Sequence, residues 1–211
     1  MARNPSSPGL GDITMSHVIK TKMEYRDFNA ILQAGADCGL VFHEGQREYR
    51  WYGRVMGDYA LPEGMTADML GRCDHAMGIP GDSFAYEVGI TTRPSGGFDV
   101  LYDFWSGGKG LEDKIGIQGI KFRERYAIHA AQNAVEALGY YSEETAEGLT
   151  VYLPEGGTVE ITPQGTVEAF GMTGGGCVEI TSRIQSALGV TVETSLKSEA
   201  FQTSQILLRE E

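Results

Sequence analysis

Cysteine and histidine are the residue types in this chain most able to bind a metal ion. Cys73 and His75 are two positions apart in an extended segment, and alternation along such a segment turns both side chains to the same side. A thiol and an imidazole can share one ion, and Cys38 and His43 would complete a Cys2His2 set that suits zinc. Neither Cys–His spacing recurs in zinc proteins. The alternative is two buried cysteines and two hydrogen-bonded histidines.

Cys177 is the candidate reactive thiol. It follows Gly174–Gly176 at the expected start of a helix, where the helix N-terminus lowers a thiol pKa and offers free N–H groups to an anion. The alternative is a packed cysteine, because Cys177 shares an apolar stripe with Ile180 and Ile184. The glycine run lacks the Lys-Ser/Thr ending of a phosphate loop, so nucleotide binding is not indicated.

Three further groups of polar residues have both a chemical and a structural interpretation. Asp99 and Asp103 share one strand face and could bind a divalent cation, although such a face is more often solvated. Gly107–Gly110 superficially resembles a phosphate cradle, and we interpret it as a mobile connection. His129 could act as a general base on a helix, but the sequence assigns it no nucleophile.

Charge and composition restrict the partners and the compartment. The net charge is −12, which repels phosphate backbones, so nucleic acid is not an expected partner. Three cysteines without disulfide spacing fit a reducing compartment, and we expect a cytoplasmic protein. No apolar run approaches the roughly 18 residues of a membrane-spanning helix. The first residues also lack the apolar segment of a signal peptide.

The elements that position these residues predict an α+β fold. Apolar alternation predicts strands over residues 16–23, 40–43, 48–52, 84–90, 98–104 and 148–154. Helical periodicity predicts a helix from Asp27 to Gly39 and a long one from Ile120 to Leu138. Hairpins dominate, which favours a mainly antiparallel sheet with helices packed on one face.

The last part of the chain reads as a second, smaller module. Thr158–Ile161 and Thr166–Met172 are expected strands, a helix begins near Cys177, and Val190–Leu196 is a third strand, which together give a β-β-α-β unit. The predicted organisation is a flexible leader (1–14), a larger α+β domain (15–154), the small module (155–200) and a tail (201–211).

Both modules resemble uncharacterised families. Met15–His17, Cys73–Ala76, Leu101–Trp105 and Tyr126–Ala127 occur in the order of landmarks in a family of cyanobacteria, plastid genomes, other bacteria and phages, so residues 15–153 resemble that family. The second module is similar to a small companion family. That similarity is carried by Val159–Ile161, Pro163, Gly165, Val167, Glu168, Cys177, Thr181, Leu188 and Gly189. Such companion modules are encoded near AAA-type ATPases, which implies an accessory or adaptor role. Neither resemblance supplies a catalytic residue.

The function expected from the sequence is therefore a non-enzymatic protein-interaction or assembly module. It would be accessory to an AAA-type ATPase or part of a phage-type assembly, with a protein partner or self-association. The alternative is a Cys/His metal-binding enzyme or a redox-sensing protein, built on Cys73 and His75 or on Cys177.

Overall fold

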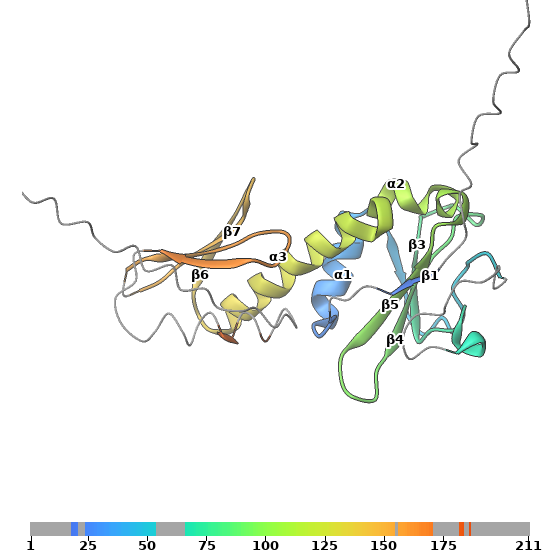
Figure 1. Ribbon diagram of the computed structural model, residues 1–211, viewed down its shortest axis with the longest axis horizontal. Helices are drawn as coiled ribbons and strands as arrows, with labels where there is room; N and C mark the ends of the chain where they lie inside the picture. The colour runs from blue at the N-terminus through green and yellow to red at the C-terminus, as the bar shows by residue number, and fades with distance from the viewer. Residues whose placement is uncertain are drawn as a thin grey trace, which may run out of the picture.

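The computed structural model describes residues 18–20, 24–53, 66–154, 156–170, 182, 183 and 186 of the 211-residue chain. The fold is α+β, as predicted, with two antiparallel sheets and a long helix whose buried side chains share one hydrophobic core with both (Figure 1). The helices are α1 (Phe28–Asp37), α2 (Leu111–Ile115) and α3 (Ile120–Ala137).

The first sheet has five strands in the order β1-β5-β4-β3-β2, and every neighbouring pair is antiparallel. Its strands are β1 (Val18–Lys20), β2 (Val41–His43), β3 (His75–Gly78), β4 (Val88–Thr92) and β5 (Phe98–Asp103). The predicted hairpin is present as β4 and β5. The strand predicted over 48–52 is not formed, because Glu48 makes only an isolated bridge to Arg72.

The second sheet is a four-stranded meander in the order β6-β7-β8-β9. Its strands are β6 (Tyr141–Thr145), β7 (Gly148–Tyr152), β8 (Thr158–Ile161) and β9 (Val167–Phe170). The domain boundary expected at 154–155 lies inside this sheet, since β7 and β8 are hydrogen-bonded neighbours. The last two strands therefore extend a hairpin that the larger domain supplies.

Helix α1 begins and ends where its sequence signals predict. The Asp27 side chain accepts a hydrogen bond from the Ala30 N–H at 3.1 Å, which satisfies one of the free donors of the first turn. Gly39 follows the helix with φ +74°, a left-handed conformation that glycine adopts without strain. The buried side of α1 includes Ala30, Ile31 and Ala34.

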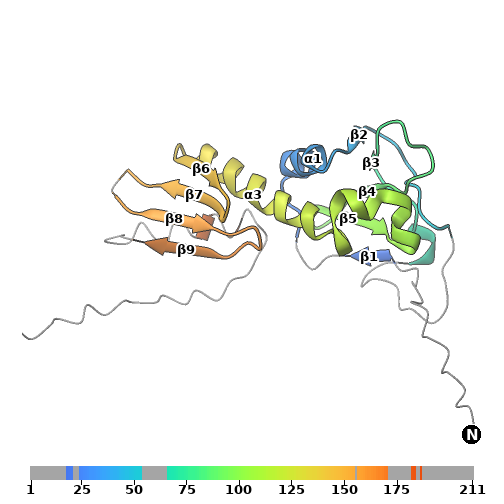
Figure 2. The same ribbon diagram turned by 90° about the horizontal axis from the view of Figure 1, so that it is seen from above.

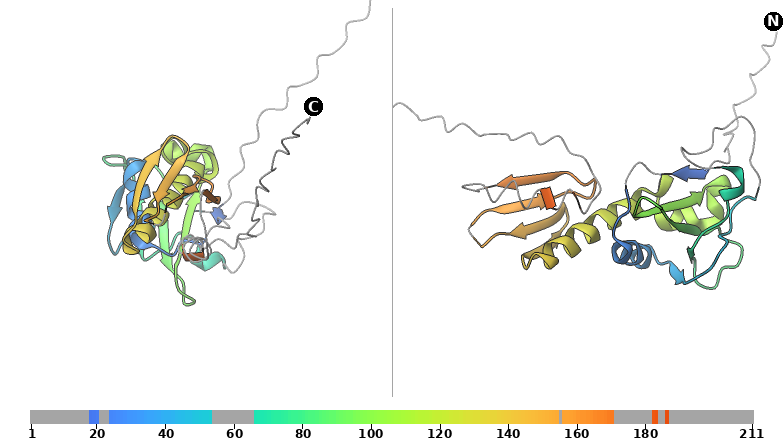
Figure 3. Two further views of the ribbon diagram at one scale, coloured as in Figure 1. Left: turned by 90° about the vertical axis from the view of Figure 1, so that its left-hand side faces the viewer. Right: turned by 90° about the horizontal axis from the view of Figure 1, so that it is seen from below.

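Helix α3 joins the two sheets into one hydrophobic core. In Figure 2 it runs from the five-stranded sheet to the four-stranded sheet, and Figure 3 shows it beside both. Phe122 and Tyr126 pack against the ring of Tyr25, which bridges to Phe98 of β5, and the same cluster continues through Leu149 and Val159 of the second sheet. The Tyr126 hydroxyl accepts hydrogen bonds from the N–H groups of Arg26 (2.7 Å) and Asp27 (3.3 Å), which fixes the start of α1 on α3.

A polar network adds a second link across α3. Arg125 of α3 pairs with Asp37 of α1 at 2.6 Å and with Glu144 of β6. His129, one turn further along the helix, has its Nε2 atom 2.7 Å from Asp37. The hydrogen bond from Arg125 lowers the pKa of Glu144. His129, which the sequence suggested as a possible general base, therefore contributes to the contact between α1 and α3.

No helix among the described residues is long and apolar enough to cross a bilayer.

Candidate interaction surface and the predicted site residues

Cys73 and His75 do not point to the same side, contrary to the prediction. Asp74 forms a bend between them, and β3 begins only at His75, so strand alternation does not extend back to Cys73. Cys73 packs in a small cluster with Tyr49 and donates its thiol to the Gln46 carbonyl at 3.1 Å. Burial, followed by the nearby carboxylates, raises the pKa of the Cys73 thiol to about 11.

His75 packs against aromatic rings on the α1 side of the sheet. Its ring centroid lies 5.4 Å from that of Phe28 and 5.3 Å from that of Phe42, and its Nδ1 accepts a hydrogen bond from the Gly45 N–H at 3.0 Å. With that proton assignment, the imidazole closes the turn after β2. This arrangement matches the hydrogen-bonded alternative of the sequence analysis.

The four predicted zinc ligands are not brought together at one site. Cys38 is buried in the main core, where burial raises its thiol pKa, and Cys73 belongs to the other cluster. His43 pairs with Ala76 across β2 and β3, so it lies on the sheet face opposite His75. Among the described residues, no group of three or more His, Cys, Asp or Glu side chains is arranged to hold a metal ion. Cys177 lies outside the described residues.

Two buried carboxylates were missed or misplaced by the sequence analysis. Glu87 is 1% exposed. Its Oε2 atom accepts hydrogen bonds from the Gln46 side chain and from the Arg50 N–H, both at 2.9 Å, and its Oε1 atom lies 2.8 Å from the Arg50 guanidinium. Asp103 is fully buried, although a solvated strand face was expected. It accepts from the N–H groups of Tyr52 (3.1 Å) and Trp105 (2.8 Å). Strand β5 is not an edge, because β1 pairs on its far side.

Residues 106–109 form a left-handed turn where a mobile connection was expected. Their φ angles are +53°, +65°, +59° and +51°, and two of them, Ser106 and Lys109, carry side chains. Such residues cost on the order of 1 kcal/mol or more each. The Gly108 carbonyl accepts from the Tyr86 N–H at 3.0 Å, and a Cβ at Gly108 would lie 3.0 Å from the Asp103 carbonyl. The turn therefore packs closely on the end of β5, and glycine is required at its centre.

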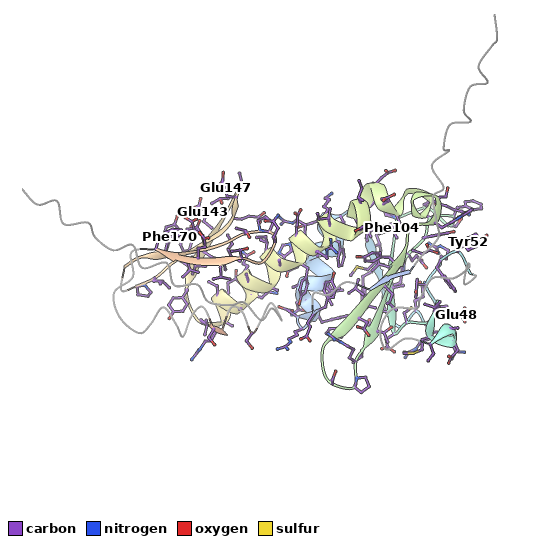
Figure 4. The ribbon with its side chains drawn as sticks, in the orientation of Figure 1. Glu48, Tyr52, Phe104, Glu143, Glu147 and Phe170 are labelled. Carbon is purple, nitrogen blue, oxygen red and sulfur yellow. The ribbon has the colours of Figure 1, made fainter. Side chains whose placement is uncertain are left out.

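The outer face of the second sheet carries a row of exposed aromatic rings. Register places Tyr141, Tyr152, Thr158 and Phe170 side by side across all four strands. The tyrosines are 67% and 43% exposed, Phe170 is 46% exposed, and the two tyrosine rings stack with centroids 5.6 Å apart. Figure 4 marks Phe170 on this sheet. The opposite face, which includes Leu149, Val151, Val159 and Ile161, is buried in the core shared with α3.

The next row on the same face is acidic. Glu143, Thr150, Glu160 and Glu168 lie side by side, and the three carboxylates are exposed. Glu160 and Glu168 are direct cross-strand partners, and like charges in that position destabilise a sheet. Residues 141–170 contain six glutamates and no Lys, Arg or His. We call the aromatic and acidic rows together the outer face.

The outer face was not found from the sequence, because it depends on pairing between strands. Tyr141 and Phe170 are 29 positions apart, and only the register of β6 through β9 aligns them. A usable signal was the absence of any basic residue from 141–170 together with period-two alternation.

Comparison with known proteins agrees with part of the resemblance. Residues 158–201 match a family described as a protein of unknown function (DUF2997). The match begins at β8 and includes β9, so an uncharacterised domain is confirmed for the second module. No curated protein and no solved structure matches the chain.

Proposed function

We propose that the protein is a non-enzymatic interaction or assembly module that binds a protein through the outer face. The observation that carries this proposal is the row of three exposed rings on one sheet face. Aromatic side chains are enriched at protein interfaces, and scattered exposed rings would need no such explanation. Here strand register gathers them next to one another.

An accessory role beside an AAA-type ATPase, or a place in a phage-type assembly, is the finer form of the proposal. The ground for the ATPase role is the resemblance of the second module to companion modules encoded near AAA-type ATPases, and the ground for the phage-type assembly is the resemblance of residues 15–153 to a family that occurs in phages. A cytoplasmic location is proposed with it, on the ground of three cysteines without disulfide spacing.

The alternative, a Cys/His metal-binding enzyme or a redox sensor, has less support from the thiols that the structure describes. Cys73 and Cys38 have raised pKa values, whereas a reactive thiol needs a lowered one. His75 and Cys73 face different clusters, so a shared ion would require the backbone around Asp74 to move.

A photo-crosslinking experiment tests the proposed function. A photoreactive phenylalanine analogue replaces Tyr152 on the outer face or Phe84, which is 79% exposed outside it, in the cells that make the protein naturally. We expect a protein cross-link of defined mass at position 152 and none at position 84. No product at 152, or the same products at both positions, would refute the proposal.

A further inference from the structure

A second exposed apolar surface lies at the start of α3. Ile117 is 72% exposed and Ile120 is 48% exposed, and they are three residues apart around the turn that the Gly119 N–H closes onto the Gly116 carbonyl. Residues 114–123 carry Lys114, Lys121 and Arg123 and no acidic residue. We call Ile117, Ile120, Lys114 and Lys121 the isoleucine knob.

The core holds the isoleucine knob in a strained conformation. Gln118 has φ +52°, and its carbonyl accepts the hydroxyl of the buried Tyr102 at 3.1 Å. A Cβ at Gly119 would lie 2.4 Å from that hydroxyl oxygen, so only glycine fits there. Strain of this kind persists where the surrounding structure fixes it, and it often marks a functional segment. A fixed, exposed apolar turn binds a partner without a large ordering cost.

The two surfaces are complementary in charge and in apolar character. The outer face offers rings beside three exposed carboxylates, and the knob offers two isoleucines between two lysines. Glu160 and Glu168 repel each other in the isolated sheet, and a lysine placed between them would relieve that cost. Two outer faces packed on each other would instead set carboxylates against carboxylates.

The isoleucine knob of one copy does not reach that copy's own outer face. The knob begins α3, while the outer face is the side of the second sheet that points away from α3. Helix α2 and the start of α3 lie at the end of the molecule with the five-stranded sheet, as Figure 2 shows. An isoleucine knob that contacts the outer face must therefore come from another molecule.

We propose that the occupant of the outer face is the isoleucine knob of a second copy of this chain, so that copies associate head to tail. Such a contact joins two different surfaces, and it gives a ring if the rotation closes and an open series if it does not. The inference rests on the proposed function and names the partner of the same face. If crosslinking at Tyr152 captures a different protein, the proposed function stands and this inference falls.

Sedimentation velocity of the full chain over a range of concentrations tests the inference. We expect a mass that rises with concentration at low salt and falls at high salt, because the contact is partly electrostatic. Glu168→Lys removes the clash with Glu160 and leaves the fold intact, and Ile117→Glu changes a mostly exposed side chain. Each variant should weaken association by about tenfold or more. Phe84→Ser, the control, should leave it unchanged.

Mixing the two variants separates this arrangement from other occupants. Glu168→Lys keeps an intact knob and Ile117→Glu keeps an intact outer face, so an equal mixture should give a discrete dimer that neither variant forms alone. A wild type that stays monomeric at low salt would overturn the inference. So would association that Glu168→Lys weakens and Ile117→Glu does not, or a mixture that stays monomeric.

Discussion

Replacement of Glu87 by glutamine tests how residues 46–50 are held on the first sheet. The Oε2 atom of Glu87 accepts hydrogen bonds from the Gln46 side chain and the Arg50 N–H, and its Oε1 atom forms an ion pair with the Arg50 guanidinium. Glutamine keeps the volume, but its NH2 group must face at least one of these donors. The substitution therefore leaves a donor unpaired in a site that is 1% exposed.

The magnitude follows from the two kinds of contact that are lost. A hydrogen bond to a charged group contributes about 1.5–3 kcal/mol, and breaking a fully buried ion pair costs about 3–5 kcal/mol. The Arg50 side chain is 41% exposed and can regain water, which places the expected loss near the lower end, about 2 kcal/mol.

Urea unfolding of the variant measures this loss. Glu147→Gln is the matched control, because it removes the same charge from an exposed turn, and it should change the unfolding free energy by less than about 0.5 kcal/mol. Equal stability of Glu87→Gln and the control would refute the assignment of Glu87 as a buried anchor.

Three further substitutions or conditions have expected outcomes. Gly89→Ala places a Cβ 2.3 Å from the Tyr49 ring and should cost about 1–3 kcal/mol in thermal unfolding, and an unchanged melting temperature would contradict that close contact. Burial raises the pKa of Cys73 to about 11, so iodoacetamide at pH 8 should modify this thiol at least about a hundredfold more slowly in the folded than in the urea-unfolded chain. Mass spectrometry of the peptide that contains Cys73 measures the two rates. Equal rates would contradict the burial of Cys73. Arg125 lowers the pKa of Glu144, so the pair stabilises the fold above the usual glutamate pKa and loses that effect as pH falls through the folded value. Between pH 6 and pH 3 the melting temperature of Arg125→Met should therefore fall by less than that of the wild type. Parallel curves of melting temperature against pH for the two proteins would contradict the pairing.

Local signals in the sequence predicted the parts of the fold that local chemistry determines. Asp27 caps the start of α1 and Gly39 follows its end, as their residue types predict. The alternation of apolar residues located β4 and β5. The strand predicted over residues 48–52 does not form, because residues with strand propensity make a strand only where an adjacent strand offers free backbone groups. In this segment Glu48 makes one isolated bridge, to Arg72.

Features that depend on distant pairing could not be predicted in the same way. The Pro154–Gly157 turn was interpreted as a domain boundary, whereas it is a connection within one sheet. Cys73 and His75 were expected on one side because the bend at Asp74 is not visible in the residue pattern. Asp103 is buried because the segment at Tyr52 and the turn at Trp105 fold over its carboxylate, and the contact with Tyr52 joins positions 51 residues apart in the sequence.

Hydroxyl-radical footprinting tests most directly whether the outer face is the binding surface. Oxidation of Tyr141, Tyr152 and Phe170 is compared between dilute protein in high salt and the assembled or partner-bound protein, with Phe84 as an exposed aromatic elsewhere. The account predicts strong protection of the three rings of the outer face and none of Phe84. Unchanged oxidation of those rings in a demonstrably bound sample would contradict it.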